Sequence, residues 1–360
     1  MKIVEVIPHL QSGGAEKFTV ELTNTFSEIG HECTVVTLYD NSEDDILKDQ
    51  LNGMVSEISL SKKRGIDFKC MLRLRKLIAR IKPTVVHLHL NSITYAIFAA
   101  LTYRKCRYIA TIHSEAKLEA GKGLHKYVRK LLFGLKLVTP ITISQESELS
   151  FKKFYGYDAT IITNGSSAYV QNNNIDLYSQ YHDGVDKLFL HAGRILDVKN
   201  QEMLVQAFER CISKGANIRL LIVGRIADDS IFNRIKDSFS DKIIYLGEVS
   251  DVKSIMSVCD AFCLSSKMEG MPMTIIEAMS VGCIPICTPV GGCINMINDR
   301  VNGFLSQGTD TESYMAKIEE FCKTNQDKLN EIKVQCLADF SSKYSIHSTA
   351  KSYINLFGNE

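Results

Sequence analysis

Residues 267–292 read KMEGMPMTIIEAMSVGCIPICTPVGG and predict a loop, a helix and a buried strand in succession. Pro272 suits the first helical position, where its missing N–H would be unpaired anyway. The apolar residues that follow predict a helix that ends at Gly282, and the run 283–288 is typical of a strand. A further strand-like run at 261–266 precedes the loop. This stretch therefore predicts a strand–helix–strand crossover, the unit of a parallel sheet.

The same alternation extends over all 360 residues and predicts two doubly wound α/β domains. Strand-like runs lie at 2–7, 33–38, 84–89, 108–112, 137–143 and 160–163, and again at 187–193, 218–224, 242–247, 261–266 and 283–288. Helical segments lie near 14–29, 67–81, 124–136, 145–154, 200–213, 229–239, 251–258 and 272–281. The stretch 164–184, rich in Asn, Ser and Gly, predicts a hinge. We expect an N-terminal domain over 1–168, a C-terminal domain over 185–340, and a segment 341–360 whose helix returns toward the first domain.

Charge is distributed unevenly along a chain whose net charge is only +1. Residues 61–136 hold 18 Lys and Arg against three acidic residues, a local balance of +15. This predicts that an anionic surface meets the first half of the chain, with a solvated basic face as the alternative. Aromatic residues there do not suggest a platform for stacking bases, so we expect no nucleic-acid partner.

Cysteine content and apolar run lengths indicate a globular protein without a signal peptide or membrane span. The 11 Cys are scattered through apolar runs, which favours reduced thiols of the cytosol over a disulfide framework. Cys259 and Cys263, like Cys283 and Cys287, are expected to be small buried apolar residues and not metal ligands.

Ligands of open α/β sheets bind beyond the carboxyl ends of the strands, so two facing sheets predict a cleft between the domains. In SGGAE (12–16), Gly13 and Gly14 open a helix whose free amides can hold an anion, but a simple turn with Ser12 near the cap fits equally well. His113 follows the strand at 108–112. As a neutral imidazole it can bond a sugar hydroxyl, unless local backbone satisfies it.

Two cations follow the first strand of the second series, in AGRILDVKN (192–200). Arg194 and Lys199 can reach one diphosphate, which a guanidinium binds bidentately and an ammonium neutralises as a point charge. The alternative is two ordinary surface cations. His87 and His89, within the earlier strand at 84–89, are expected to be structural, with His89 the nearer to the cleft.

Two glutamates bracket the start of the helix in the opening stretch. Glu269 lies in the preceding loop, whereas Glu277 lies about one turn inside the helix and leans back toward its first amides. Those amides, of Met271, Met273 and Thr274 after Gly270, offer a seat for a phosphate. Since a carboxylate beside a diphosphate would repel it, each glutamate is expected to accept hydrogen bonds from neutral hydroxyls on either side.

This combination resembles the retaining glycosyltransferases of family 4, which have the GT-B fold of two facing Rossmann-like domains. The motifs are SGGAE, TIHS at 111–114, NG at 164–165, GR and KN within 193–200, IVG at 222–224, YLGEV at 245–249, the glutamate block with AMSVGCIPICTPVGG, and NGFL at 302–305. The resemblance implies that Glu277 binds ribose and Glu269 the transferred sugar. It also implies that Arg194 and Lys199 bind the diphosphate, with Gly14 near the phosphates and His113 beside the sugar.

The resemblance further implies that the nucleotide base rests on backbone groups near Leu246 to Val249. Two positions depart from the family pattern. Asn295 stands where the family often has Glu, and Arg225 follows IVG where a second Gly or an acidic pair is frequent. We expect altered contacts to the nucleotide or a neighbouring loop there, with activity retained.

The resemblance implies transfer of a hexose or N-acetylhexosamine from a nucleotide diphosphate sugar, UDP-linked first and GDP-linked second, to a lipid-linked glycan. Such an enzyme acts in capsule, O-antigen or exopolysaccharide synthesis. We expect it in the cytoplasm, peripheral at the inner face of the plasma membrane. The sequence has no Asp-x-Asp motif that would indicate a metal clamp on the diphosphate, and we expect no cofactor. The alternatives are a sugar-nucleotide 2-epimerase of the same fold and a non-catalytic sugar-nucleotide-binding subunit.

Overall fold

The computed structural model describes residues 1–11, 13–120, 123–170, 180–181, 184 and 186–358. The chain divides into two compact units, Met1–Gly165 with Ile346–Glu360, and Ser166–Ser345. Residues 171–179 and 182–183 of the predicted hinge, and residue 185 at the predicted start of the second domain, lie outside the described part.

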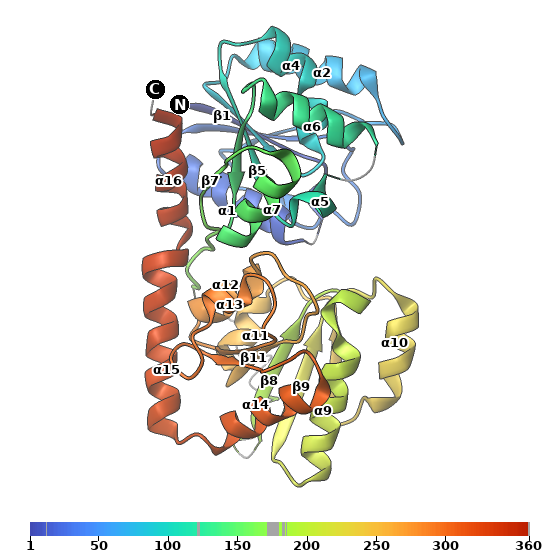
Figure 1. Ribbon diagram of the computed structural model, residues 1–360, viewed down its shortest axis with the longest axis vertical. Coiled ribbons are helices and arrows are strands. Elements are labelled where there is room, and N and C mark those ends of the chain that lie inside the picture. Colours follow the sequence, from blue (N-terminus) through green and yellow to red (C-terminus); the bar gives the residue numbers. More distant parts are fainter. Residues whose placement is uncertain (12, 121–122, 171–179, 182–183, 185, 359–360) are drawn as a thin grey trace. The chain divides into compact units, whose positions relative to one another are not determined.

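The first unit is a seven-stranded parallel sheet in the order β3-β2-β1-β4-β5-β6-β7 with helices on both faces (Figure 1). Its strands are β1 (Lys2–Ile7), β2 (Glu32–Thr37), β3 (Ser56–Ser59), β4 (Val85–His89), β5 (Arg107–Ile112), β6 (Thr139–Thr142) and β7 (Thr160–Ile161). Its helices are α1 (Gly14–Glu28), α2 (Phe68–Ile81), α3 (Ser92–Tyr95), α4 (Ile97–Thr102), α5 (Ala116–Glu119), α6 (Leu124–Gly134), α7 (Gln145–Tyr155) and α16 (Ile346–Gly358).

The second unit is a six-stranded parallel sheet in the order β10-β9-β8-β11-β12-β13. Its strands are β8 (Lys187–Ala192), β9 (Ile218–Val223), β10 (Ile243–Gly247), β11 (Ala261–Leu264), β12 (Ile284–Cys287) and β13 (Phe304–Leu305). Its helices are α9 (Gln201–Ser213), α10 (Asp229–Ile235), α11 (Val252–Val258), α12 (Met273–Ser280), α13 (Cys293–Met296), α14 (Thr311–Lys323) and α15 (Gln326–Asp339). Phe189 of β8 packs edge-on against Phe208 of α9 and Phe321 of α14.

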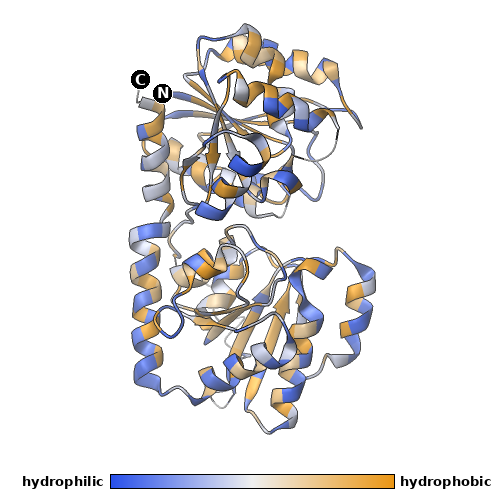
Figure 2. Ribbon diagram, in the orientation of Figure 1, coloured by the Kyte–Doolittle hydropathy of each residue, from blue (hydrophilic) through white to orange (hydrophobic). Residues whose placement is uncertain are grey.

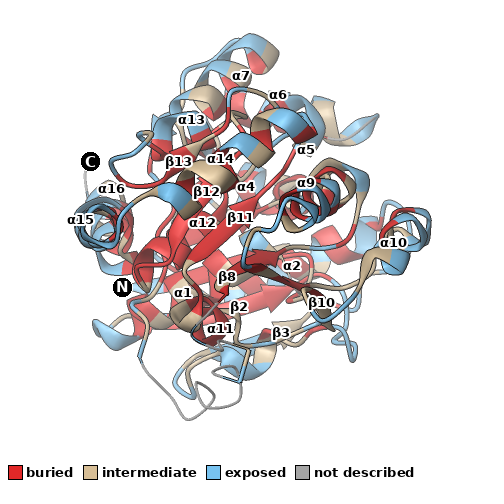
Figure 3. Cartoon of the chain, turned by 90° about the horizontal axis from the view of Figure 1, so that it is seen from below, coloured by how far each residue is buried: buried red, intermediate tan, exposed pale blue. Residues whose placement is uncertain are grey.

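Both sheets are parallel and alternate with helices, as the pattern predicts, and both have the Rossmann-like strand order, so the predicted fold class is confirmed. Central strands are hydrophobic and covered on both faces, as parallel sheets require (Figures 2 and 3). The predicted strands and helices are present. The pattern missed β3, β13, α3 to α5, and α13 to α15, which are mostly short or carry few apolar residues. Pro272 is the residue before α12, not its first residue as predicted.

Alternation along the central strands of the first unit divides its core into two faces. Val4 and Val6 of β1 point to the face covered by α2, α3, α4, α6 and α7. Glu5 points to the opposite face, where α1 and α16 pack against each other. The predicted return of the C-terminal helix to the first domain is thereby confirmed.

All 11 cysteines are free. Cys259, Cys263, Cys283 and Cys287 are buried, as predicted. Burial raises the pKa of the Cys259 and Cys283 thiols well above the usual range, so both stay protonated near neutral pH. Among the described residues, no helix combines the length and hydrophobicity that a transmembrane span requires.

Packing of α16 on α1 is testable at Phe357, which is buried with its ring centroid 5.7 Å from that of Phe26. We expect Phe357→Ala to lower the free energy of unfolding of the first unit by about 3–5 kcal/mol, because it leaves a cavity under the helix. Ser352→Ala, exposed on the same helix, should change it by less than about 0.5 kcal/mol. Urea unfolding followed by circular dichroism measures both, and equal transitions for the two variants would contradict the packing argument.

Candidate functional site

Predicted site residues of the second unit lie along the carboxyl edge of its sheet. Arg194 follows β8, Leu246 lies at the end of β10, and the loop containing Glu269 follows β11. Because all strand pairs here are parallel, these loops emerge at one edge. Arg194 is exposed, and its carbonyl accepts a hydrogen bond from Nε2 of Gln201 at 2.9 Å. The edge thus presents a guanidinium from a loop whose backbone is anchored to α9.

Lys199 and Glu269 form an ion pair that the sequence did not predict. Nζ of Lys199 lies 2.7 Å from Oε1 of Glu269, and the Ser266 hydroxyl donates to the same oxygen at 2.6 Å. Exposed fractions of the two side chains are only 21% and 11%. The Ser265 hydroxyl donates to the Lys199 carbonyl at 2.8 Å and ties the two loops together. Without a ligand, therefore, Lys199 already has a carboxylate partner within the predicted site.

The start of α12 lies between the two glutamates, as the sequence predicted. Met273 is its first residue, so Glu277 lies one turn inside the helix and Glu269 remains in the loop. Glu277 is 3% exposed and has interactions in the fold. Met271 is also buried, so its side chain faces the core while the chain turns into the helix. Amides at this helix start remain the predicted phosphate seat.

The loop of Glu269 is packed directly against the segment that follows β12. Gly291 has a φ of +47°, and a Cβ there would lie 1.8 Å from the carbonyl oxygen of Glu269. Gly292 donates its amide hydrogen to the Gly270 carbonyl at 2.8 Å. Only glycine permits this approach, so the pair at 291 and 292 fixes the backbone that presents Glu269.

Gly13 and Gly14 lie at the start of α1 as predicted, with Gly14 as its first residue. Ser12, the alternative cap, lies outside the described residues. Glu16 in the first turn is 8% exposed and 3.6 Å from Nδ1 of His9. A carboxylate therefore lies near these amides, which sequence reasoning overlooked. An anion bound at this helix start would have to tolerate that negative charge.

His113 is held by its neighbours on both the backbone and the ring. Its amide donates to Oε2 of Glu119 at 2.6 Å, and ring Nε2 lies 2.9 Å from Nδ1 of His89. Ring Nδ1 is buried and has no hydrogen-bond partner among the residues that the structure describes. The alternative that local backbone satisfies this ring is therefore wrong. Burial, with His89 and His87 nearby, holds the pKa of His113 well below its usual value, so the ring is neutral near pH 7.

A buried polar cluster lies behind His113 on the face covered by α1 and α16. Oε2 of Glu5 lies 2.9 Å from Nδ1 of His87 and 2.7 Å from Nε2 of His89. Nε2 of His87 lies 2.7 Å from the Thr111 hydroxyl, which bonds the Tyr353 hydroxyl at 2.7 Å. His87 and His89, which were expected to be structural, are both fully buried. Sequence reasoning missed Glu5, although a lone Glu within the apolar run KIVEVI marks it.

Glu5, His87 and His89 are also the residues, within the described part of the chain, whose ligand atoms are close enough to hold a metal ion. Two imidazoles and a carboxylate suit a transition metal. Each of the three groups is, however, already within hydrogen-bond distance of another, and the second nitrogen of each ring bonds a further side chain. Hydrogen bonding alone accounts for every polar atom of this triad.

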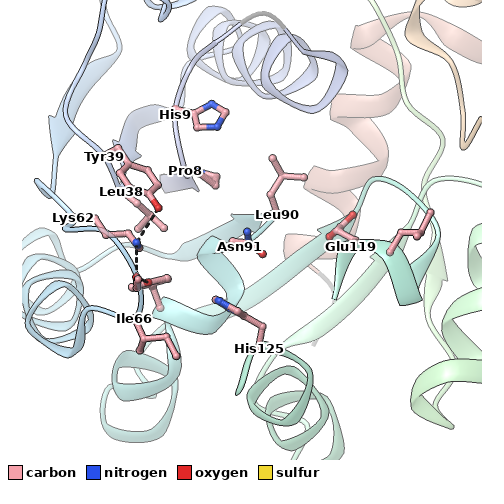
Figure 4. A pocket seen from close by; sticks show the side chains of 13 residues that line it. Pro8, His9, Leu38, Tyr39, Lys62, Ile66, Leu90, Asn91, Glu119 and His125 are labelled. Carbon is pink, nitrogen blue, oxygen red and sulfur yellow. Dashed lines mark hydrogen bonds between the residues drawn. The ribbon is translucent and has the colours of Figure 1, made fainter. Parts of the chain in front are cut away.

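A cavity of about 590 Å³ opens in the first unit beside the Glu119 loop (Figure 4). It is lined by Pro8, His9, Leu38, Tyr39, Lys62, Gly65, Ile66, Leu90, Asn91, Tyr95, Leu118, Glu119 and His125. Nζ of Lys62 donates to the Tyr39 hydroxyl at 2.8 Å and to the Gly65 carbonyl at 2.7 Å. Glu119 thus connects this cavity to the backbone of His113.

The basic segment predicted at 61–136 forms helices that mix cations with exposed apolar side chains. We call the following exposed residues of α2, α6 and the loop before α2 the basic face: Lys63, Arg64, Ile66, Phe68, Lys69, Leu72, Lys76, Arg80, Leu124, Tyr127, Lys130 and Leu131. Both helices cover the same side of the sheet. Arg129 is an exception, because it is fully buried and pairs with Glu119 at 3.4 Å.

Two family models match the chain: "Glycosyltransferase Family 4" over residues 12–167 and "Glycosyl transferases group 1" over residues 178–334. Among curated proteins, the chain is 26% identical over 283 residues to the capsular polysaccharide biosynthesis glycosyltransferase CapM of Staphylococcus aureus, covering 74% of this chain and 73% of that protein. It is 25% identical to the UDP-Gal:alpha-D-GlcNAc-diphosphoundecaprenol alpha-1,3-galactosyltransferase of Escherichia coli, covering 74% and 72%.

Solved structures share the fold over the whole chain. Anabaena Alr3699/HepE in complex with UDP and glucose superposes with a TM-score of 0.83 at 18% identity, covering 100% of both chains. A glycosyltransferase from Rickettsia africae superposes with a TM-score of 0.84 at 18% identity, covering 99% of this chain and 97% of that chain.

Close packing at Gly291 gives a direct test of how the Glu269 loop is held. We expect Gly291→Ala to lower the free energy of unfolding of the second unit by about 2 kcal/mol or more, because the new Cβ meets backbone and the positive φ is strained. Gly53→Ala is the control, since a Cβ there meets nothing within 4 Å. Urea titration of both variants measures the difference, and a Gly291→Ala protein as stable as wild type would contradict this account.

Proposed function

We propose that this chain, which belongs to the family 4 glycosyltransferases, transfers a hexose or N-acetylhexosamine with retention from a nucleotide diphosphate sugar to a lipid-linked glycan. The proposed donor is a UDP-sugar first and a GDP-sugar second. The product is part of a surface polysaccharide such as capsule or O-antigen. The Lys199–Glu269 pair, which joins the loop before α9 to the loop before α12, is the observation that supports this most directly.

In this proposal, each part of such a donor is bound by its own group from the loops at the carboxyl edge of the sheet or from His113. Lys199 and Arg194 would bind the diphosphate, together with the amides near Met273. Glu269 would accept a hydrogen bond from the transferred sugar, and Glu277 from the ribose. Leu246 to Val249 would support the base, and His113 would contact the sugar. Lys199 has to exchange Glu269 for the diphosphate, which releases the carboxylate for the sugar hydroxyl.

The proposed reaction breaks the bond between the anomeric carbon and the diphosphate oxygen. Arg194, Lys199 and the helix amides stabilise the negative charge that develops on the leaving diphosphate. The acceptor oxygen forms the new bond on the same face of the sugar, and its proton passes to the departing diphosphate. Glu269 orients the ring and stabilises positive charge on it. This scheme uses no covalent enzyme intermediate and no metal ion.

The cavity beside Glu119 is the proposed acceptor site. Ile66 and Leu118 line it and are also exposed to solvent, at 44% and 59%. They join the cavity to the basic face, whose cations and apolar side chains suit an anionic bilayer surface. A lipid-linked acceptor would then reach the cavity from the membrane. We infer a peripheral location at the inner face of the plasma membrane.

The donor assignment is tested by a transfer assay with Lys199→Met and Glu269→Gln. We expect each to lower kcat by roughly 100-fold, because each removes charge complementarity to the diphosphate or the reacting ring. Lys267→Met is the matched control, since Lys267 forms an exposed ion pair with Asp197 at 2.6 Å and should leave kcat unchanged. A thermal-shift screen with UDP-, GDP- and ADP-sugars identifies the donor.

Three outcomes of these assays would contradict the donor proposal. Full activity of both site variants would remove Lys199 and Glu269 from the mechanism. Loss of activity with a chelator would require a metal ion. Nucleotide release without net sugar transfer would favour the 2-epimerase.

Membrane docking is tested by sedimentation with vesicles that contain anionic lipid. We expect Lys69→Glu with Lys76→Glu, both exposed on α2, to weaken binding at least tenfold, because each cation near an anionic surface contributes about 1 kcal/mol. Lys323→Glu with Lys328→Glu changes the net charge equally in the second unit and serves as control. Binding should also weaken with salt. Binding that ignores both salt and anionic lipid would contradict docking.

A further inference from the structure

A continuous series of hydrogen bonds leads from a buried carboxylate to Nε2 of His113, the ring whose Nδ1 has no partner in the described structure. Glu5 bonds Nε2 of His89 at 2.7 Å, and Nδ1 of His89 lies 2.9 Å from Nε2 of His113. Glu5 and His89 are fully buried. We propose that Glu5 and His89 are positioning residues that fix the tautomer of His113, so that its Nδ1 presents a lone pair to a hydroxyl of the bound donor sugar.

Proton positions follow from the carboxylate outward. An ionised carboxylate only accepts hydrogen bonds, so a neutral His89 must carry its proton on Nε2. Its Nδ1 is then an acceptor, and Nε2 of His113 must carry the proton that it accepts. Since a neutral imidazole has a single N–H, Nδ1 of His113 is left with a lone pair. This nitrogen is buried and has no partner within the described structure.

Charges in the cluster agree with this direction of donation. Burial alone would raise the pKa of Glu5, but the charges and hydrogen bonds of His87 and His89 lower this pKa to about 2. Burial, aided by the charge of His87, lowers the pKa of His89 to about 4. At neutral pH Glu5 is therefore ionised and His89 is neutral. The reverse direction would require a protonated Glu5, which these shifts disfavour.

The consequence for the substrate is a requirement for a donor group. A lone pair on Nδ1 accepts a hydrogen bond from a sugar hydroxyl, but gains nothing from a fluorine or a hydrogen at the same position. A buried acceptor that stays unpaired costs binding energy, so the ring discriminates against a sugar that lacks this hydroxyl. This step rests on the proposed function, whereas the tautomer of His113 does not.

The first experiment measures the tautomer without any donor. Nitrogen-15 NMR of the histidine-labelled full chain distinguishes Nε2–H from Nδ1–H rings, and the loss of one signal set in His113→Asn assigns the residue. We expect His113 to be the Nε2–H form in wild type and a mixture in His89→Phe. His89→Gln should keep the wild-type form, because one amide can donate to Glu5 and accept from His113.

Tyr353→Phe is the matched control, since it removes a hydroxyl from the same buried network away from the path to His113. Its His113 signals should stay in the wild-type form. An Nδ1–H tautomer of His113 in wild type, or an unchanged ring in a folded His89→Phe protein, would overturn the proposal. So would one equivalent of a transition metal in the purified protein that both Glu5→Gln and His89→Phe remove.

The second experiment measures affinity for UDP, UDP-glucose, UDP-galactose and UDP-N-acetylglucosamine by titration calorimetry. For the sugar that binds wild type, we expect His89→Phe to weaken the UDP-sugar roughly tenfold and to leave UDP unchanged. One deoxyfluoro analogue of that sugar should bind both proteins equally. An equal loss of affinity for UDP and for the UDP-sugar in His89→Phe would overturn the proposed positioning of His113. If no UDP-sugar binds but His113 has the expected tautomer, the result would contradict the proposed donor class. The positioning of His113 by Glu5 and His89 would remain supported.

Discussion

Parallel pairing of every strand is the constraint on which both units depend. The chain can add the next parallel strand to a sheet only after a crossover connection that returns it to the opposite edge. Each strand therefore ends at the same edge as its neighbours. In the second unit this gathers the loops of Arg194, Leu246 and Glu269, which are far apart in sequence. In the first unit it sets His89 and Thr111 side by side and brings His113 next to them. The topology of the sheets therefore brings the predicted site residues together, which no single motif does.

Local patterns predicted most elements because the residues that decide them are local. The apolar run after Pro272 and the glycine at 282 define α12 to within one residue at either end. Elements with weaker local signals escaped, such as β3, whose residues are exposed or half-buried. Predicted roles of the site residues remain proposals, but their common edge follows from strand ends that the sequence does show.

Pairings between distant residues could not be predicted, because they depend on strand order. Lys199 meets Glu269 only since β11 lies next to β8, and Glu5 meets His89 only since β4 lies next to β1. Periodicity assigns each strand its faces but not its neighbours. His87 and His89 could accordingly be assigned to one strand from sequence, whereas the carboxylate of Glu5 that bonds both rings could not be predicted.

Each unit holds a carboxylate that already has a hydrogen-bonding or charged partner without a ligand. Glu5 with its imidazoles and Glu269 with Lys199 differ, however, in how far they are buried. Glu5 is fully buried with its imidazole partners, and separating it from them would leave an uncompensated charge in the core. The Lys199–Glu269 pair is partly exposed, so water can assist its exchange. In the proposed function, a diphosphate brings more negative charge than one carboxylate and draws Lys199 away. The buried cluster is therefore suited to holding one arrangement of protons, and the partly exposed pair to the exchange of partners that the proposed function requires.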